Sequence, residues 1–159
     1  MIQITLPDGS IKSVAQNTTV MDVAKSISEG FARNVISGKF NDTVVETTTP
    51  LTTDGSLILY TWKDSEGKNA FWHSSAHLLA QAILHFYPNA KLTIGPAIEN
   101  GFYYDVDFGD ETLSDNDFKK IEDKMIEFAR QKFEFKLRAV SKADALHYYK
   151  ERNNEFKVD

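Results

Sequence analysis

The sequence contains no cysteine, no long apolar run and no excess of basic charge. Without cysteine, the 159 residues can form neither a disulfide nor a thiolate metal site, and a cysteine nucleophile is excluded as well. No apolar run approaches the roughly 20 residues that a membrane-spanning helix needs, and the first residues lack the basic and then apolar pattern of a secretion signal. We therefore expect a soluble cytoplasmic protein with no membrane partner.

Acidic residues outnumber basic ones, 23 against 18, and the net charge is −5. Neither the first sixty residues nor the remainder is basic by itself. The overall charge therefore gives no support to a nucleic-acid partner. A local basic stretch could still hold RNA, although an ordinary solvated surface is the simpler interpretation. The densest such stretch contains Lys132, Lys136, Arg138 and Lys142.

The first sixty residues predict two strands, a helix and three further strands. Alternating apolar residues on either side of Asp8-Gly9 indicate a hairpin. A helix capped by Thr18 or Thr19 follows, and Gly30 is expected to be its left-handed terminal residue. The compact arrangement of these elements is a mixed sheet crossed by one helix, which is a ubiquitin-like β-grasp fold. The strands are expected at residues 2–6, 11–14, 35–36, 44–45 and 57–60.

The polar segment from Lys63 to Asn69 interrupts the hydrophobic pattern for about the length of an interdomain connection. We therefore predict two domains, residues 1–62 and residues 63–159. The first domain contains no histidine and no cluster of polar residues. It is expected to bind a partner or to act as a spacer rather than to catalyse.

A histidine pair is the chemical feature of the second domain. His73 and His77 lie four residues apart in a run of helix-forming residues that Pro88 ends, so both imidazoles share one helix face. The pair could bind zinc with a further ligand, could position and deprotonate a water for ester hydrolysis, or could pack in a core. No glutamate follows His73, which excludes the usual metalloprotease motif. His85 lies well round the helix and is interpreted as a surface or packing residue.

Beyond Pro88 the sequence predicts a hairpin, then a helix, a strand, a second helix and a final strand. The hairpin turns at residues 99–101, and Tyr103 and Tyr104 face opposite sides of its second strand. The final strand would begin at Phe156 and is cut short, which predicts that the chain is a fragment. The remaining elements are expected to start at Ser114, Phe133 and Ser141, with a packing stripe formed by Phe118, Ile121, Met125 and Phe128.

Two blocks of sequence resemble bacterial threonyl-tRNA synthetases. The opening M-I-Q-I-T-L-P-D-G-S, with the ββαβββ order, is similar to the TGS β-grasp domain of that family. H-S-S-A-H-L-L-A-Q-A and I-G-P-A-I-E-N-G-F-Y-Y-D-V-D are similar to the start of its editing domain. The likeness covers essentially the whole chain. It implies an α+β fold in which a complete β-grasp domain precedes an editing domain that is incomplete at its C-terminus.

The resemblance implies a parent enzyme that attaches threonine to its tRNA with ATP, as a class II aminoacyl-tRNA synthetase. ATP, magnesium and a zinc ion would serve a catalytic domain that is not in this chain, so no metal or cofactor is expected here. The implied partner is threonine tRNA, bound through its acceptor arm and its aminoacylated 3′ end. The parent is expected to be a homodimer through parts that are also not in this chain.

The resemblance further implies a partial editing site, which hydrolyses serine wrongly esterified to threonine tRNA. His73 and His77 match the family's histidine pair, and Lys157 matches its pocket lysine before a strand valine. These three are the expected catalytic residues. The family's other editing residues, an aspartate and a C-x-x-x-H motif, are implied to lie beyond this chain, so the chain alone is expected to be inactive.

Substrate binding is assigned to Tyr104, which matches the family's pocket tyrosine, and to Gly95 and Pro96, where the backbone can approach a ligand closely. A different function stays open from the residues alone. In that alternative the chain is a stand-alone RNA- or nucleotide-binding module without catalysis.

Overall fold

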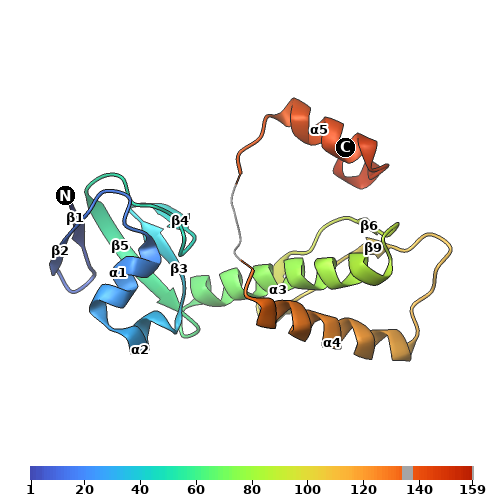
Figure 1. Cartoon of the computed structure of the whole chain (residues 1–159), viewed down its shortest axis with the longest axis horizontal. Coiled ribbons are helices and arrows are strands. Elements are labelled where there is room, and N and C mark those ends of the chain that lie inside the picture. The colour runs from blue at the N-terminus through green and yellow to red at the C-terminus, as the bar shows by residue number, and fades with distance from the viewer. Residues whose placement is uncertain (134–137, 159) are drawn as a thin grey trace. The chain divides into compact units, whose positions relative to one another are not determined.

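A computed structural model describes residues 1–133 and 138–158 of the chain (Figure 1). The chain divides into two compact units, Met1–Phe71 and Trp72–Asp159. The sequence placed this division slightly earlier, between residues 62 and 63. Within the described part of the chain, no helix is both long and apolar enough to cross a membrane.

The first unit is a five-stranded mixed sheet with helix α1 (Val20–Ile27) packed on one face (Figure 1). The strand order is β2-β1-β5-β3-β4, in which β1 and β5 are parallel and the other neighbours are antiparallel. This order confirms the predicted β-grasp fold. The strands are β1 (Ile2–Thr5), β2 (Ile11–Val14), β3 (Val35–Phe40), β4 (Thr43–Val45) and β5 (Gly55–Thr61).

Helix α1 begins where it was predicted because Thr19 and Asp22 cap each other's backbone. Thr19 Oγ1 accepts from the Asp22 N–H at 3.1 Å, and Asp22 Oδ2 accepts from the Thr19 N–H at 3.3 Å. The helix then buries its apolar stripe against the sheet. The largest fully buried side chains of this core are Ile4, Val20, Val23, Leu51 and Leu57.

The predicted helix end at Gly30 is wrong. Helix α1 ends at Ile27 because Ser28 is extended, with φ −166° and ψ 147°. The Ser28 hydroxyl accepts from the Phe31 N–H at 3.0 Å and thereby starts a second short helix, α2 (Glu29–Ala32). Gly30 therefore lies inside α2, and a serine, not a glycine, separates the two helices.

The segment from Lys63 to Asn69 is not the connection that its composition suggested. Helix α3 (Ser65–Phe86) begins inside it, directly after β5. The Asp64 carboxylate accepts from the Thr61 N–H at 2.7 Å and from the Thr61 hydroxyl at 3.0 Å. Gly67 is required because a Cβ there would strike the Thr61 carbonyl group. The polar residues thus form the start of a helix, where backbone N–H groups need polar partners.

The second unit contains two short antiparallel ribbons and further helices. Its core joins Ala82, Ile83 and Tyr87 to Ile121. The ribbons are β6 (Lys91–Leu92) with β9 (Val106–Asp107), and β7 (Ala97–Ile98) with β8 (Gly101–Phe102), which turns where predicted. The helices that follow are α4 (Asp115–Gln131), α5 (Lys142–Glu151) and a 3-10 helix, η1 (Glu155–Lys157).

Helices α4 and α5 both begin after the serines that predicted them. The Ser114 hydroxyl donates to Asp117 Oδ2 at 2.6 Å, and the Ser141 hydroxyl accepts from the Asp144 N–H at 3.1 Å. In the stripe predicted for α4, Phe118 is an exception, since it is 52% exposed and does not reach the core. The strand predicted from Phe133 lies largely outside the described residues.

The strand predicted at Phe156–Val158 is wrong, because the chain forms η1 there. The Val158 N–H bonds to the Glu155 carbonyl oxygen at 3.0 Å, which closes a 3-10 turn. No strand among residues 1–133 and 138–158 pairs with this segment. Local turns therefore satisfy the backbone groups that a strand would have left open.

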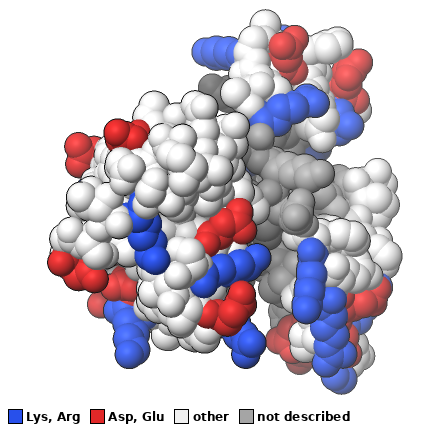
Figure 2. All heavy atoms as spheres, turned by 60° about the vertical axis from the view of Figure 1, so that its left-hand side comes forward, with Lys and Arg blue, Asp and Glu red and all other residues white. Residues whose placement is uncertain are grey.

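Charges of both signs are spread over the surface. On the face drawn in Figure 2, Lys and Arg side chains are interspersed with Asp and Glu side chains. This mixture agrees with the small net charge of −5.

Candidate functional site

His73 and His77 face each other on successive turns of α3, as their spacing predicted. Their Nε2 atoms are 3.0 Å apart, and the two rings meet edge to face with centroids 4.5 Å apart. One nitrogen of such a pair must donate and the other must accept, so at least one imidazole is neutral. A neutral imidazole nitrogen is the group that can accept a proton from water.

His77 borders a pocket of about 810 Å³ in the second unit. The pocket brings together three of the predicted site residues, His77, Tyr104 and Lys157, which come from α3, from the segment after β8 and from η1. Its volume lies within the range of about 300–1,000 Å³ that is typical of small-molecule sites. His73, Gly95 and Pro96 are not among the described residues that line it.

The protonation of His77 is biased towards the neutral form. Partial burial is the main cause that lowers its pKa, and the neighbouring charges of His73 and Lys157 lower it further. His77 therefore remains a proton acceptor at pH values where an ordinary histidine begins to protonate.

Tyr104 lies against the backbone of Gly95. A Cβ at Gly95 would overlap the Tyr104 ring, so the glycine serves the site by making room for the tyrosine. The two segments are aligned by a backbone hydrogen bond of 3.0 Å from the Asp105 N–H to the Ile94 carbonyl. Burial, with a smaller effect of Tyr149, raises the pKa of Tyr104, so its phenol stays protonated and can donate.

Lys157 reaches the pocket because η1 is tied to β6. Glu155 Oε1 pairs with Lys91 Nζ at 2.9 Å, and Asn154 Nδ2 donates to the Leu92 carbonyl at 3.1 Å. The partners lie more than sixty residues apart in the sequence. Sequence reasoning missed Lys91, Asn154 and Glu155, because no local pattern marks contacts of that range.

Helix α5 adds an aromatic and cationic wall to the pocket. The Arg152 guanidinium carbon lies 3.6 Å from the centroid of the Tyr148 ring, and Arg152 Nη1 donates to the Tyr148 carbonyl at 3.2 Å. Tyr148 also meets Tyr149 edge to face, with centroids 5.2 Å apart. The four-residue spacing of Tyr148 and Arg152 on a predicted helix could have signalled this pair.

The other two histidines lie apart from the facing pair. His85 is exposed and packs edge-on against Phe86 and Phe128, as interpreted from the sequence. His147 pairs with Glu151 at 3.3 Å on the exposed side of α5. Across the described parts of the chain, no group of three or more histidine, aspartate or glutamate side chains is placed to hold a metal ion.

Both units have counterparts among known proteins. Residues 2–61 match the TGS domain family. Over all 159 residues, the chain is 65% identical to the threonine–tRNA ligase of Flavobacterium johnsoniae, 50% to that of Cytophaga hutchinsonii and 47% to that of Clostridioides difficile. The chain matches the N-terminal region of threonine–tRNA ligases. It spans about a quarter of the length of each of these relatives, 24 or 25%.

The resemblance to the N-terminal region of threonine–tRNA ligases that the sequence motifs predicted is therefore confirmed. The TGS domain accounts for the β-grasp sheet of the first unit, whereas the histidine pair and its pocket lie outside the TGS match. The alignments with the threonine–tRNA ligases continue through the second unit without a break in coverage.

Proposed function

We propose that this chain is the N-terminal part of an enzyme that attaches threonine to its tRNA, and that its second unit hydrolyses serine wrongly esterified to that tRNA. The names of the relatives support the parent activity. The observation that carries the editing role is the pair of facing histidines beside a pocket that also contains Tyr104 and Lys157.

A hydrolytic site is needed because binding alone discriminates poorly between serine and threonine. Serine is threonine without one methyl group, and a missing methyl group changes binding by only about 1–3 kcal/mol. A synthetic site alone therefore accepts serine too often, and a second site must remove it. The bond to be broken is an ester, whose ribose oxygen leaves more readily than the nitrogen of an amide.

The pocket residues and the adjacent His73 supply the groups that such a reaction needs. His73 and His77 hold the attacking water, and the neutral His77 imidazole accepts its proton. The Lys157 ammonium offsets the negative charge that develops on the ester oxygen. Tyr104 donates a hydrogen bond from its protonated phenol and orients the substrate. Gly95 contributes indirectly, by leaving space for the Tyr104 ring.

The test replaces the matching segment of the Flavobacterium johnsoniae ligase with this chain. Release of serine from serine-charged threonine tRNA is then measured with the resulting chimeric ligase. His73→Ala and His77→Ala should each slow release by about 10²–10⁴-fold, because a general base is lost. Threonine attachment should not change.

His85→Ala is the matched control, because His85 is an exposed histidine of the same helix that packs against Phe86 and Phe128. It should leave serine release unaltered. Equal loss in all three variants would indicate a damaged helix, and full activity in both pair variants would contradict the editing role. The non-catalytic alternative predicts RNA affinity from the 159-residue chain that weakens as salt is raised, and filter binding measures it.

A further inference from the structure

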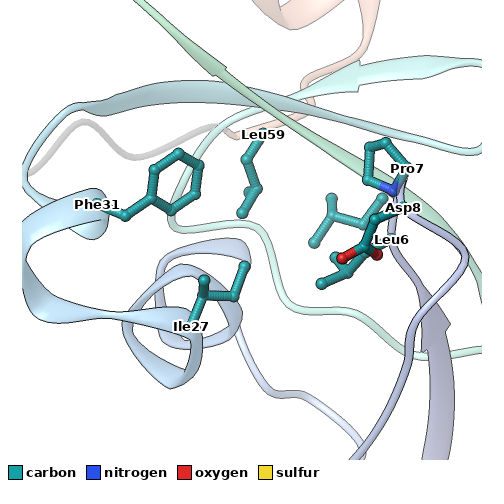
Figure 3. A pocket seen from close by; sticks show the side chains of 7 residues that line it. Leu6, Pro7, Asp8, Ile27, Phe31 and Leu59 are labelled. Atoms are coloured by element: carbon teal, nitrogen blue, oxygen red, sulfur yellow. The ribbon is translucent and has the colours of Figure 1, made fainter.

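A second pocket, of about 280 Å³, lies within the TGS domain. Figure 3 shows Leu6, Ile27, Phe31 and Leu59 pointing towards one common space, with Asp8 beside them. Leu6 directly follows β1, and Leu59 lies on β5. The pocket shares no residue with the site of the second unit.

The break between α1 and α2 creates this pocket. Because Ser28 is extended, the chain turns away from the axis of α1 after Ile27. Phe31 therefore lies on the separate helix α2. Ile27 is the last residue of the apolar stripe of α1, and it remains 42% exposed. An apolar side chain is thus left uncovered between two helices and the sheet.

Asp8 gives the pocket a fixed negative charge. It lies in the tight turn between β1 and β2, where the Leu6 N–H bonds to the Ser10 carbonyl at 2.8 Å. Asp8 Oδ1 accepts from the Ser10 hydroxyl at 2.6 Å and from the Ser10 N–H at 2.9 Å. These bonds lower the pKa of Asp8, so the carboxylate is charged at neutral pH. Among the described residues, no lysine, arginine or histidine lines the pocket.

The charge and the size of the pocket restrict what can occupy it. A nucleotide would bring phosphate groups towards Asp8, where no lining cation neutralises them. The volume lies just below the range of about 300–1,000 Å³ for small-molecule sites. Pro7, Asp8 and Ile27 are exposed, so a small free ligand would stay largely in water. A polypeptide can instead fill the pocket with one side chain and cover the rim with its neighbours.

We propose that this TGS-domain pocket docks a protein segment that inserts one large apolar side chain and pairs an adjacent lysine or arginine with Asp8. The pocket has apolar walls and a charged turn at its edge. A segment that carries both an apolar and a basic side chain therefore fits it better than a segment that carries only one of them. The docking does not depend on the hydrolytic role proposed for the second unit.

The test uses the 159-residue chain and the blocked peptide acetyl-Gly-Leu-Lys-Gly-amide, followed by NMR. The methyl signals of Ile27, Leu57 and Leu59 should shift in a saturable way, with a Kd on the order of 1 mM for so short a probe. A peptide with serine in place of leucine, or glutamate in place of lysine, should bind at least about fivefold more weakly.

Matched variants distinguish a loss of binding caused by the substituted side chain from one caused by misfolding. Asp8→Asn retains a side-chain oxygen for the turn and should weaken binding of the lysine peptide about fivefold. Asp42→Asn, at an exposed aspartate outside the pocket lining, should not. Ile27→Ser should weaken binding, whereas Val44→Ser, at an exposed apolar position of β4 outside the pocket, should not. The amide spectrum of each variant shows whether it is folded.

Three results would overturn the proposal. The first is the absence of saturable shifts at the pocket methyl groups. The second is equal binding by the chains with Asp8→Asn and Asp42→Asn. The third is binding of adenosine monophosphate, or of isopentylamine alone, at least as tight as that of the peptide, which would make the pocket a small-molecule site.

Discussion

At the scale of single residues, His77 is the histidine that borders the second-unit pocket. Its imidazole is 3.0 Å from His73 and is kept neutral by partial burial and by nearby positive charge. The pKa of His77 is therefore lower in the folded chain than in the unfolded chain. Protonation favours the unfolded chain, so the contribution of His77 to stability is full above the unfolded pKa and is lost as the pH falls towards the folded pKa.

We expect His77 to titrate below the ordinary histidine value of 6.5 when the ring proton signals of the 159-residue chain are followed by NMR. Lys157→Gln removes a charge that disfavours the imidazolium form, so it should move the titration to higher pH. Lys119→Gln, in an exposed ion pair of α4, is the control and should leave the titration in place. A His77 pKa at or above 6.5 would contradict the assignment.

At the scale of elements, the short helix η1 carries Lys157 and is held in place from outside itself. Lys91 and Leu92 of β6 provide the contacts, through Glu155 and Asn154. Exposed ion pairs of this kind contribute only about 0–1 kcal/mol to stability. In the proposed editing reaction their importance is positional, because a reacting group displaced by a small distance loses much of its effect.

Glu155→Gln should therefore affect serine release more than stability. In the chimeric ligase we expect release to slow by about tenfold, with little change in the melting temperature. Asp123→Asn makes the same change of charge in the Lys119–Asp123 pair of α4 and should alter neither quantity. Glu155→Asp, which keeps the charge, should restore part of the rate. A purely structural role would instead lower stability and activity together.

At the scale of the whole chain, two separate cores hold two compact units. Leu57 is fully buried in the core of the first unit, and Ile121 is buried in that of the second. Among the residues that the structure describes, none belongs to both of these core clusters. Each core can therefore be weakened without removing a side chain from the other.

Two core variants should act on different unfolding transitions. Leu57→Ala is expected to destabilise the first unit by about 2–5 kcal/mol, and Ile121→Ala the second unit by a similar amount. Calorimetry of the 159-residue chain should show each variant lowering one transition while the other stays in place. Equal lowering of both transitions by either variant would mean that the chain unfolds as one cooperative body.

Much of the fold could be predicted because its signals are local. The alternation around Asp8-Gly9 predicted the first hairpin, and Thr19, Ser114 and Ser141 each predicted the start of a helix. The errors arose where two local signals competed. Gly30 predicted a helix end, but the helix is broken at Ser28. The polar residues after Lys63 predicted a connection, but they belong to the start of α3. The catalytic roles assigned to His73, His77 and Lys157 stay predictions.

The sequence by itself determined the β-grasp domain, the facing histidines and the resemblance to threonine–tRNA ligases, because each depends on residues close together in the chain or on a motif. Only the tertiary structure decided that Lys157 shares a pocket with His77 and Tyr104, and that Glu155 pairs with Lys91. It also decided that Asp8 and Phe31 border one apolar pocket. Contacts of this range follow from how whole elements pack, which no local spacing of residues specifies.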